Sequence, residues 1–108
     1  MDARKFQSQF AKALGKLLRF IDECGDEVTL GDTYPGKFKH KPNGKHPKGL
    51  AIDLNLFIKG VLQDTTEAHA KYGAYWKGLG GIWGGDWDSD GIKDPNDWDG
   101  NHYEWRDK

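Results

Sequence analysis

The sequence predicts an α+β fold, with two helices packed on a small antiparallel sheet in a single domain that spans residues 1–108. Three observations lead to this prediction. Apolar residues recur at helical spacing in residues 3–23, alternate as in a strand in residues 49–57, and return to helical spacing from residue 65 or 66 to about residue 79. Aromatic residues make up 13% of the chain, so Trp, Tyr and Phe must supply much of the core.

The segment Ala3 to Glu23 is predicted to form an amphipathic helix. Asp2 could cap its start, and Gly25 could end it. Lys and Arg line the polar face, so a helix lying on a membrane surface is one interpretation. Packing on the sheet is favoured, because so small a domain needs this apolar face for its core. The apolar positions are Phe6, Phe10, Leu14, Leu17, Leu18 and Ile21.

Residues 49–57 predict a strand, and Glu27–Leu30 predicts a short strand before it. Alternation gives the strand of residues 49–57 one apolar face for the core and a second face, on which Asp53 points away from the core. The chain is then expected to turn at Lys59-Gly60. The apolar face holds Leu50, Ile52, Leu54 and Leu56, and the other face holds Ala51, Asp53 and Asn55.

A second helix is predicted from residue 65 or 66, with Glu67 in its favourable first turn. Gly80-Gly81 would end it, and Ile82-Trp83 would begin another short strand. His40 and His69 fit no motif and are predicted to lie on the surface. The buried face of this helix is expected to hold Tyr72, Tyr75, Trp76 and Leu79.

A short strand is also predicted near the C-terminus. His102 and Glu104 would share one of its faces, while Tyr103 and Trp105 would take the other. If this strand is a neighbour of the strand of residues 49–57, Asp53 and His102 can converge.

Two motifs carry the candidate chemistry: His46-Pro47-Lys48-Gly49-Leu50-Ala51-Ile52-Asp53 and Asp99-Gly100-Asn101-His102-Tyr103-Glu104. Two imidazoles and a carboxylate, from His46, His102 and Asp53, could hold one zinc ion. Asp99 adds a base beside the last imidazole, and Glu104 is a candidate to orient that ring. Three protein ligands, an open position for water and a base are the components of a catalytic zinc site.

Each of these residues also has an ordinary explanation when it is taken alone. His46 would be an exposed loop histidine, Asp53 a polar residue at a strand end, and His102 a surface histidine. Their order and spacing, taken together, favour the zinc site.

The motifs HxxGxAxD and DxxHxE resemble those of zinc peptidases of the M15 type, which include D-alanyl-D-alanine carboxypeptidases and phage L-alanyl-D-glutamate endopeptidases, or endolysins. The segment from Leu79 to Trp87 also looks like the WGGDW segment of that group. The resemblance runs from about Thr29 to Trp105. It implies an α+β fold of the Hedgehog/DD-peptidase type and a substrate in peptidoglycan. The residue roles that it implies are zinc ligation by His46, Asp53 and His102 and general base catalysis by Asp99.

Two positions depart from the family's pattern. Members usually carry an Arg shortly before the first motif, where it helps to polarise the substrate carbonyl, but no Arg lies between Arg19 and Arg106. Lys37 or Lys39 could substitute, as a point charge without the guanidinium fork. Many members also have a Ser two residues before the first His, where this chain has Gly44.

Residues 86–97 have the outline of an EF-type calcium loop. Asp occupies positions one, three, five, nine and twelve, Gly is sixth, and the seventh residue can offer its carbonyl. Lys93 at position eight and an Asp at position twelve depart from the usual loop, and an acidic surface loop is the alternative. The predicted calcium ligands are Asp86, Asp88, Asp90, Ile92, Asp94 and Asp97.

This loop ends two residues before Asp99. Without a cation its clustered carboxylates would repel one another, whereas calcium would order the segment and so fix Asp99 and His102. The sequence therefore suggests that calcium activates the enzyme.

Three functions stay open at this point. The first is a peptidoglycan endopeptidase of the phage endolysin type. The second is a D,D-carboxypeptidase or dipeptidase of the same chemistry. The third is a metal-binding relative without catalysis, for which the missing Arg is the best support.

Charge and composition exclude several other classes of protein. The formal net charge of −1 gives no electrostatic footprint for nucleic-acid binding, and a single cysteine, Cys24, allows no internal disulfide. No apolar run resembles a signal peptide or reaches membrane-spanning length. We therefore expect a monomer made as a soluble cytoplasmic protein, which another factor must release if it acts on the cell wall.

Overall fold

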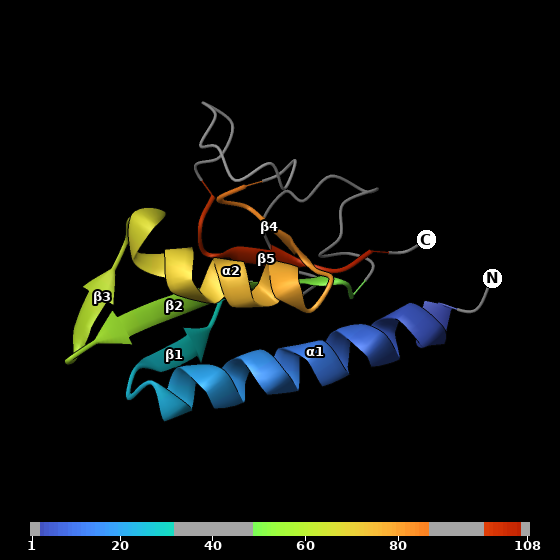
Figure 1. The fold of residues 1–108 in the computed structure, drawn as a ribbon, viewed down its shortest axis with the longest axis horizontal. Helices are drawn as coiled ribbons and strands as arrows, with labels where there is room; N and C mark the ends of the chain where they lie inside the picture. The colour runs from blue at the N-terminus through green and yellow to red at the C-terminus, as the bar shows by residue number, and fades with distance from the viewer. Residues whose placement is uncertain (1–2, 32–48, 87–98, 107–108) are drawn as a thin grey trace.

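The computed structural model describes residues 3–31, 49–86 and 99–106, and these residues form two α-helices and an open antiparallel sheet of five strands (Figure 1). The strands pair in the order β1-β2-β5-β4, and β3 also pairs with β2. The predicted α+β fold is confirmed. In chain order the elements are α1 (Ala3–Glu23), β1 (Glu27–Leu30), β2 (Ala51–Ile58), β3 (Val61–Gln63), the 3-10 helix η1 (Glu67–His69), α2 (Ala70–Gly78), β4 (Ile82–Trp83) and β5 (His102–Glu104).

The alternation of β2 decides which face of the sheet is covered. Leu54 and Leu56 are fully buried on the face beneath the helices, whereas Asp53 and Asn55 are only partly buried on the other face. The predicted division of this strand into a core face and a polar face is confirmed. Packed on the core face are Phe6, Phe10, Ala13, Leu17 and Ile21 of α1, Tyr72 and Trp76 of α2, Trp83 of β4 and Tyr103 of β5.

Trp76 connects the two layers at the centre of this core. Its ring is fully buried and lies edge-on to Phe10 of α1, with 5.9 Å between the ring centroids. Its Nε1 donates to the carbonyl of Ile82 at 3.1 Å and to that of Glu104 at 2.9 Å. The side chain of Trp76 therefore links α2 to α1 by ring packing and to β4 and β5 by hydrogen bonds.

Both α-helices end in the same glycine motif. After α1, the N–H of Gly25 donates to the carbonyl of Asp22, and the N–H of Asp26 donates to the carbonyl of Ile21. Gly25 has φ of 83°, and Gly80, at the equivalent place after α2, has φ of 104°. The two backbone bonds from Gly25 and Asp26 make a Schellman motif, whose left-handed residue is usually Gly. The predicted ends of both helices are confirmed.

A tight turn brings β3 back against β2. Lys59 and Gly60 take φ of 51° and 79°, which suits a two-residue hairpin. β3 pairs with residues 56–58 and β5 with residues 51–53, and both lie on the edge of β2 that β1 leaves open. Residues 54 and 55 therefore lie between the stretches that pair with these two strands.

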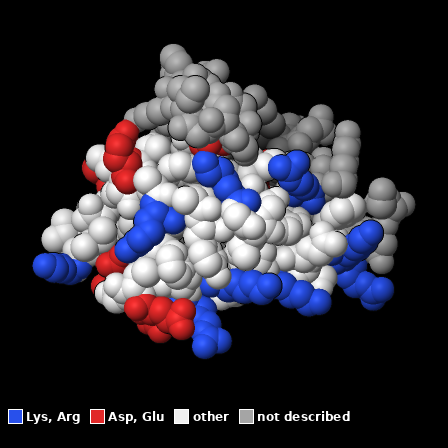
Figure 2. Space-filling model, viewed as in Figure 1, with Lys and Arg blue, Asp and Glu red and all other residues white. Residues whose placement is uncertain are grey.

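The polar side of α1 is exposed, and basic side chains are spread along it (Figure 2). Its apolar side belongs to the core, where Leu17 and Ile21 are almost fully buried. Packing on the sheet therefore accounts for the amphipathic pattern of this helix. Within the described residues, no helix has both the length and the apolar character that crossing a bilayer requires.

Two glycines, one within α1 and one just after its end, predict opposite effects of the same substitution. Gly15 lies in the helix with open space around it, so Gly15→Ala should raise the free energy of unfolding by up to about 1 kcal/mol. Gly25→Ala should lower it by about 1–2 kcal/mol, because a Cβ strains the left-handed backbone that ends the helix. Urea unfolding of both variants measures the changes. Stabilisation by Gly25→Ala would contradict this account of the helix end.

Candidate active site

The register between β2 and β5 sets Asp53 directly opposite His102. The N–H of Leu54 donates to the carbonyl of Asn101 at 2.8 Å, so the neighbouring Asp53–His102 pair takes a non-hydrogen-bonded position, where side chains approach closely. Oδ1 of Asp53 lies 3.2 Å from Nδ1 of His102. The predicted convergence of these two residues is confirmed.

Glu104 lies on the same face of β5, two residues beyond His102. Its Oε1 is 2.8 Å from Nε2 of His102, so each ring nitrogen meets a carboxylate oxygen. The side chains are largely removed from solvent, with 9% of His102 and 13% of Glu104 exposed. Two hydrogen bonds on opposite sides hold the imidazole in one orientation.

The two carboxylates also set the charge of this ring. Burial desolvates His102 and would lower its pKa, but the hydrogen bonds and charges of Asp53 and Glu104 outweigh desolvation and raise the pKa to about 9. The site therefore favours positive charge between the carboxylates. A metal cation would meet the same electrostatic field as the proton.

Asp99 begins the tight turn that leads into β5. Its carbonyl accepts from the N–H of His102 at 3.0 Å, and its own N–H donates to the carbonyl of Gly84 at 3.2 Å. The N–H of Gly84 donates to the carbonyl of His102 at 2.9 Å. A Cβ on Gly84 would overlap the backbone of Asp99, so only Gly allows this contact. Gly84 thus ties Asp99 and His102 to one another through the backbone.

Gly100 holds the same turn from its other side. Its N–H donates to Oγ1 of Thr66 at 3.2 Å, and its carbonyl accepts from Nε1 of Trp83 at 2.7 Å. A Cβ at this position would overlap Thr66. The turn is therefore held against β4 and against the segment before α2, and these contacts fix the backbone from which the Asp99 side chain extends.

Comparison with known proteins identifies the family. The family model described as D-alanyl-D-alanine carboxypeptidase matches residues 39–105, which is more than half of the chain. The chain belongs to the M15 peptidase family. Membership of the M15 family supports a peptidase that acts on peptidoglycan peptides. No protein among the curated ones matches the chain.

M15 peptidases are generally zinc-dependent, and the described residues fit such an ion in part. Two ligand atoms that each lie about 2.0–2.1 Å from a tetrahedral zinc ion are about 3.3 Å apart. The 3.2 Å between Asp53 Oδ1 and His102 Nδ1 matches this separation. No three His, Cys, Asp or Glu side chains of the described part are grouped to hold a metal. The third predicted ligand, His46, lies outside the described residues, as do Lys37 and Lys39.

Asp86 is the one predicted calcium ligand that the structure describes. It is buried, with 2% exposed, and its Oδ2 lies 2.6 Å from Nζ of Lys77. The ammonium of Lys77 thus supplies positive charge to this carboxylate. The other predicted calcium ligands lie outside the described residues, namely Asp88, Asp90, Ile92, Asp94 and Asp97.

His69 was predicted to lie on the surface, and this prediction is wrong. Only 2% of the residue is exposed, and its Nδ1 lies 2.9 Å from the hydroxyl of Tyr103. Burial lowers the pKa of His69 to about 4, although a hydrogen bond to the backbone of Gln63 works in the opposite direction. His69, Tyr72 and Trp76 follow helical spacing, and this spacing was the signal of its burial.

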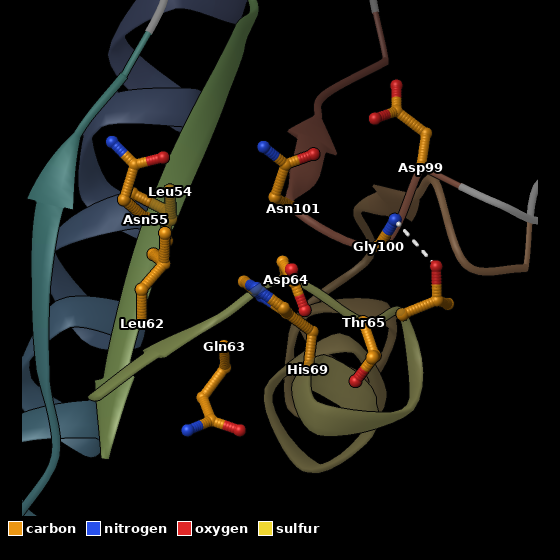
Figure 3. A pocket seen from close by; sticks show the side chains of 11 residues that line it. Leu54, Asn55, Leu62, Gln63, Asp64, Thr65, His69, Asp99, Gly100 and Asn101 are labelled. Carbon is orange, nitrogen blue, oxygen red and sulfur yellow. Dashed lines mark hydrogen bonds between the residues drawn. The ribbon is translucent and has the colours of Figure 1, made fainter. Parts of the chain in front are cut away.

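A pocket of about 290 Å³ adjoins the candidate base (Figure 3). It lies beside Leu54 and Asn55, the residues between the stretches of β2 that pair with β3 and β5. In Figure 3 Asn55, Asn101 and Asp99 lie in the upper part of the view, and Gln63 lies in the lower part. The pocket is therefore continuous with the site built around Asp99, and the sequence alone did not reveal it.

The buried, neutral state of His69 predicts a pH dependence of stability. Its pKa is about 4 in the folded protein and ordinarily 6.5, so on acidification the unfolded chain takes up a proton first. The neutral His69 ring makes its full contribution to the free energy of unfolding above about pH 7. About 2–3 kcal/mol of this contribution is lost between pH 6.5 and 4. Urea unfolding of the wild type and His69→Gln over this range tests the prediction. The stability advantage of the wild type should shrink as the pH falls, and a constant advantage would contradict the neutral, buried ring.

Proposed function

We propose that this protein is a zinc-dependent endopeptidase that cuts L-alanyl-D-glutamate bonds in peptidoglycan stem peptides, as phage endolysins do. The observation that carries the proposal is the 3.2 Å pair of Asp53 and His102, with Glu104 on the far nitrogen of the ring. Membership of the M15 family supports the peptide substrate. The proposed setting is synthesis in the cytoplasm as a monomer, followed by action on the cell wall during host lysis.

His46, Asp53 and His102 would hold the zinc ion. When bound, zinc supplies Lewis acidity, which polarises the scissile carbonyl and lowers the pKa of water toward 7. Asp53 would offer Oδ1 and His102 would offer Nδ1, the two atoms that face one another at 3.2 Å. Glu104 accepts the proton of Nε2, and so keeps the imidazole in the tautomer and orientation that ligation needs.

Asp99 is proposed as the general base. It takes a proton from the attacking water and later gives it to the leaving amine, so one carboxyl group serves both proton transfers. The backbone bonds of Asp99 with Gly84 and His102, and the bond from Gly100 to Thr66, keep this residue beside His102. Lys37 or Lys39 is proposed to act on the substrate carbonyl in place of the family's Arg.

A D,D-carboxypeptidase or dipeptidase of the same chemistry is the second candidate. The description of the matching family model favours it. Zinc-loaded protein incubated with purified peptidoglycan separates the candidates by the products found in mass spectrometry. New N-terminal D-glutamate would support the endopeptidase, and free D-alanine would support the carboxypeptidase. No product from protein that still binds zinc stoichiometrically would reject both, and would leave a metal-binding relative without catalysis.

If Asp99 is the general base, its substitution should reduce turnover without changing zinc binding. Asp99→Ala should lower kcat by about 10²–10⁴-fold, because it removes the group that moves the proton. Zinc stoichiometry should stay the same, since Asp99 is not a proposed ligand. Steady-state kinetics and metal analysis of the purified variant measure the two effects. A variant that keeps wild-type turnover would exclude Asp99 as the base.

We also propose that calcium activates the enzyme through residues 86–97. The support is the calcium-type spacing of carboxylates in a segment that leads directly to Asp99. Low calcium in the cytoplasm would keep the enzyme idle, and exposure to the cell envelope would activate it. Zinc-loaded protein should be severalfold more active in millimolar calcium than in calcium-free buffer, with magnesium as the control. Equal rates with calcium, with magnesium and without either ion would contradict the calcium proposal and would leave the zinc proposal unaffected.

A further inference from the structure

We propose that the pocket beside Asp99 is a subsite for a substrate residue whose aliphatic side chain ends in a primary ammonium. The inference rests on the proposed function, because the pocket adjoins the site assigned above. At about 290 Å³ it suits one side chain rather than a sugar ring. Asn55 lies two residues beyond Asp53 on the same face of β2, so a peptide that passes His102 and continues along this strand reaches the pocket.

The charges around the pocket favour a cation. Asp64 and Asp99 line it, and none of the lining residues that the structure describes is a Lys or Arg. Asp64 is exposed, and its carboxylate makes no ion pair with any residue that the structure describes. His69 adds no positive charge, because burial lowers its pKa to about 4. A carboxylate ligand would therefore be repelled here, and an ammonium would be attracted.

The described lining of the pocket offers several hydrogen-bond acceptors, among them the carboxylates of Asp64 and Asp99. Nδ2 of Asn55 donates to Oγ1 of Thr29 at 3.2 Å, and Nε2 of Gln63 donates to the carbonyl of Val61 at 3.0 Å. Each of these bonds uses one N–H of its amide and leaves the amide oxygen for a ligand. An ammonium has three donors and no acceptor, which complements such a lining.

Leu62 accounts for the aliphatic part of the proposed side chain. It is 53% exposed, one of the few large apolar side chains that the described surface leaves in water. It lines the pocket together with Asp64. The methylene groups of a lysine-like side chain would cover Leu62 while the ammonium reaches Asp64, as long cationic side chains commonly do.

The test uses two synthetic stem peptides, L-Ala-γ-D-Glu-L-Lys-D-Ala and the same peptide with Nε-acetyl-lysine. Zinc-loaded full-length protein is assayed for cleavage, as kcat/KM, and for binding. Binding is read from the side-chain amide signals of Asn55, Gln63 and Asn101 in NMR spectra, which report occupancy of the pocket whether or not the peptide is cut. The lysine peptide should be favoured about fivefold, the size of one partly exposed ion pair.

Two variants locate the source of this preference. Asp64→Asn should abolish it, because the ammonium loses its partner. Glu67→Gln removes the same charge from an exposed residue that does not line the pocket, and should leave the preference intact. Equal binding of the two peptides by the wild type, or an unchanged preference in Asp64→Asn, would overturn the inference. A preference in binding without cleavage of either peptide would reject the proposed function and support the subsite.

Discussion

A slip of one residue between β2 and β5 would send Asp53 or His102 to the opposite face of the sheet, because side chains alternate along a strand. The core prevents this slip. Ile52 is paired with Tyr103 in the same register, and both are almost completely buried beneath the helices. The packing of apolar side chains on one face therefore determines which polar groups meet on the other.

The turn before β5 depends on the same register. Gly84 bonds to the backbones of Asp99 and His102, and Gly100 bonds to Thr66 and Trp83. Both glycines are required by close contact, since a Cβ on either would overlap a neighbour. The buried cluster of two carboxylates and one imidazole then favours a positive charge between them, either a proton or a metal ion. A bound metal would also stabilise the fold by mass action.

Much of this arrangement follows from local patterns in the sequence. Periodicity predicts both ends of α1, the position of β1, the two faces of β2 and the meeting of Asp53 with His102. The predicted start of the central strand at Gly49 was early, because Gly49 has φ of 70° and β2 begins at Ala51. The sequence pattern does not distinguish a flexible Gly at a strand start from a left-handed one just before it.

Features that depend on distant partners could not be predicted in this way. The polar partner of the buried His69 ring is the hydroxyl of Tyr103, 34 residues later. Asp86 forms an ion pair with Lys77 on α2, which the outline of a calcium loop does not reveal. The pocket exists because β3 and β5 pair with different stretches of one edge of β2. Each of these depends on strand pairing and helix packing, which periodicity alone leaves open.

The central claim is that the β2–β5 register brings together Asp53 and His102, two of the three proposed zinc ligands. A crystal structure of the zinc-loaded protein, with anomalous scattering measured at the zinc edge, tests it most directly. The account predicts zinc bound to Oδ1 of Asp53 and Nδ1 of His102, with Glu104 still bonded to Nε2. Zinc bound away from this pair, or bound through Nε2 with Glu104 displaced, would contradict it.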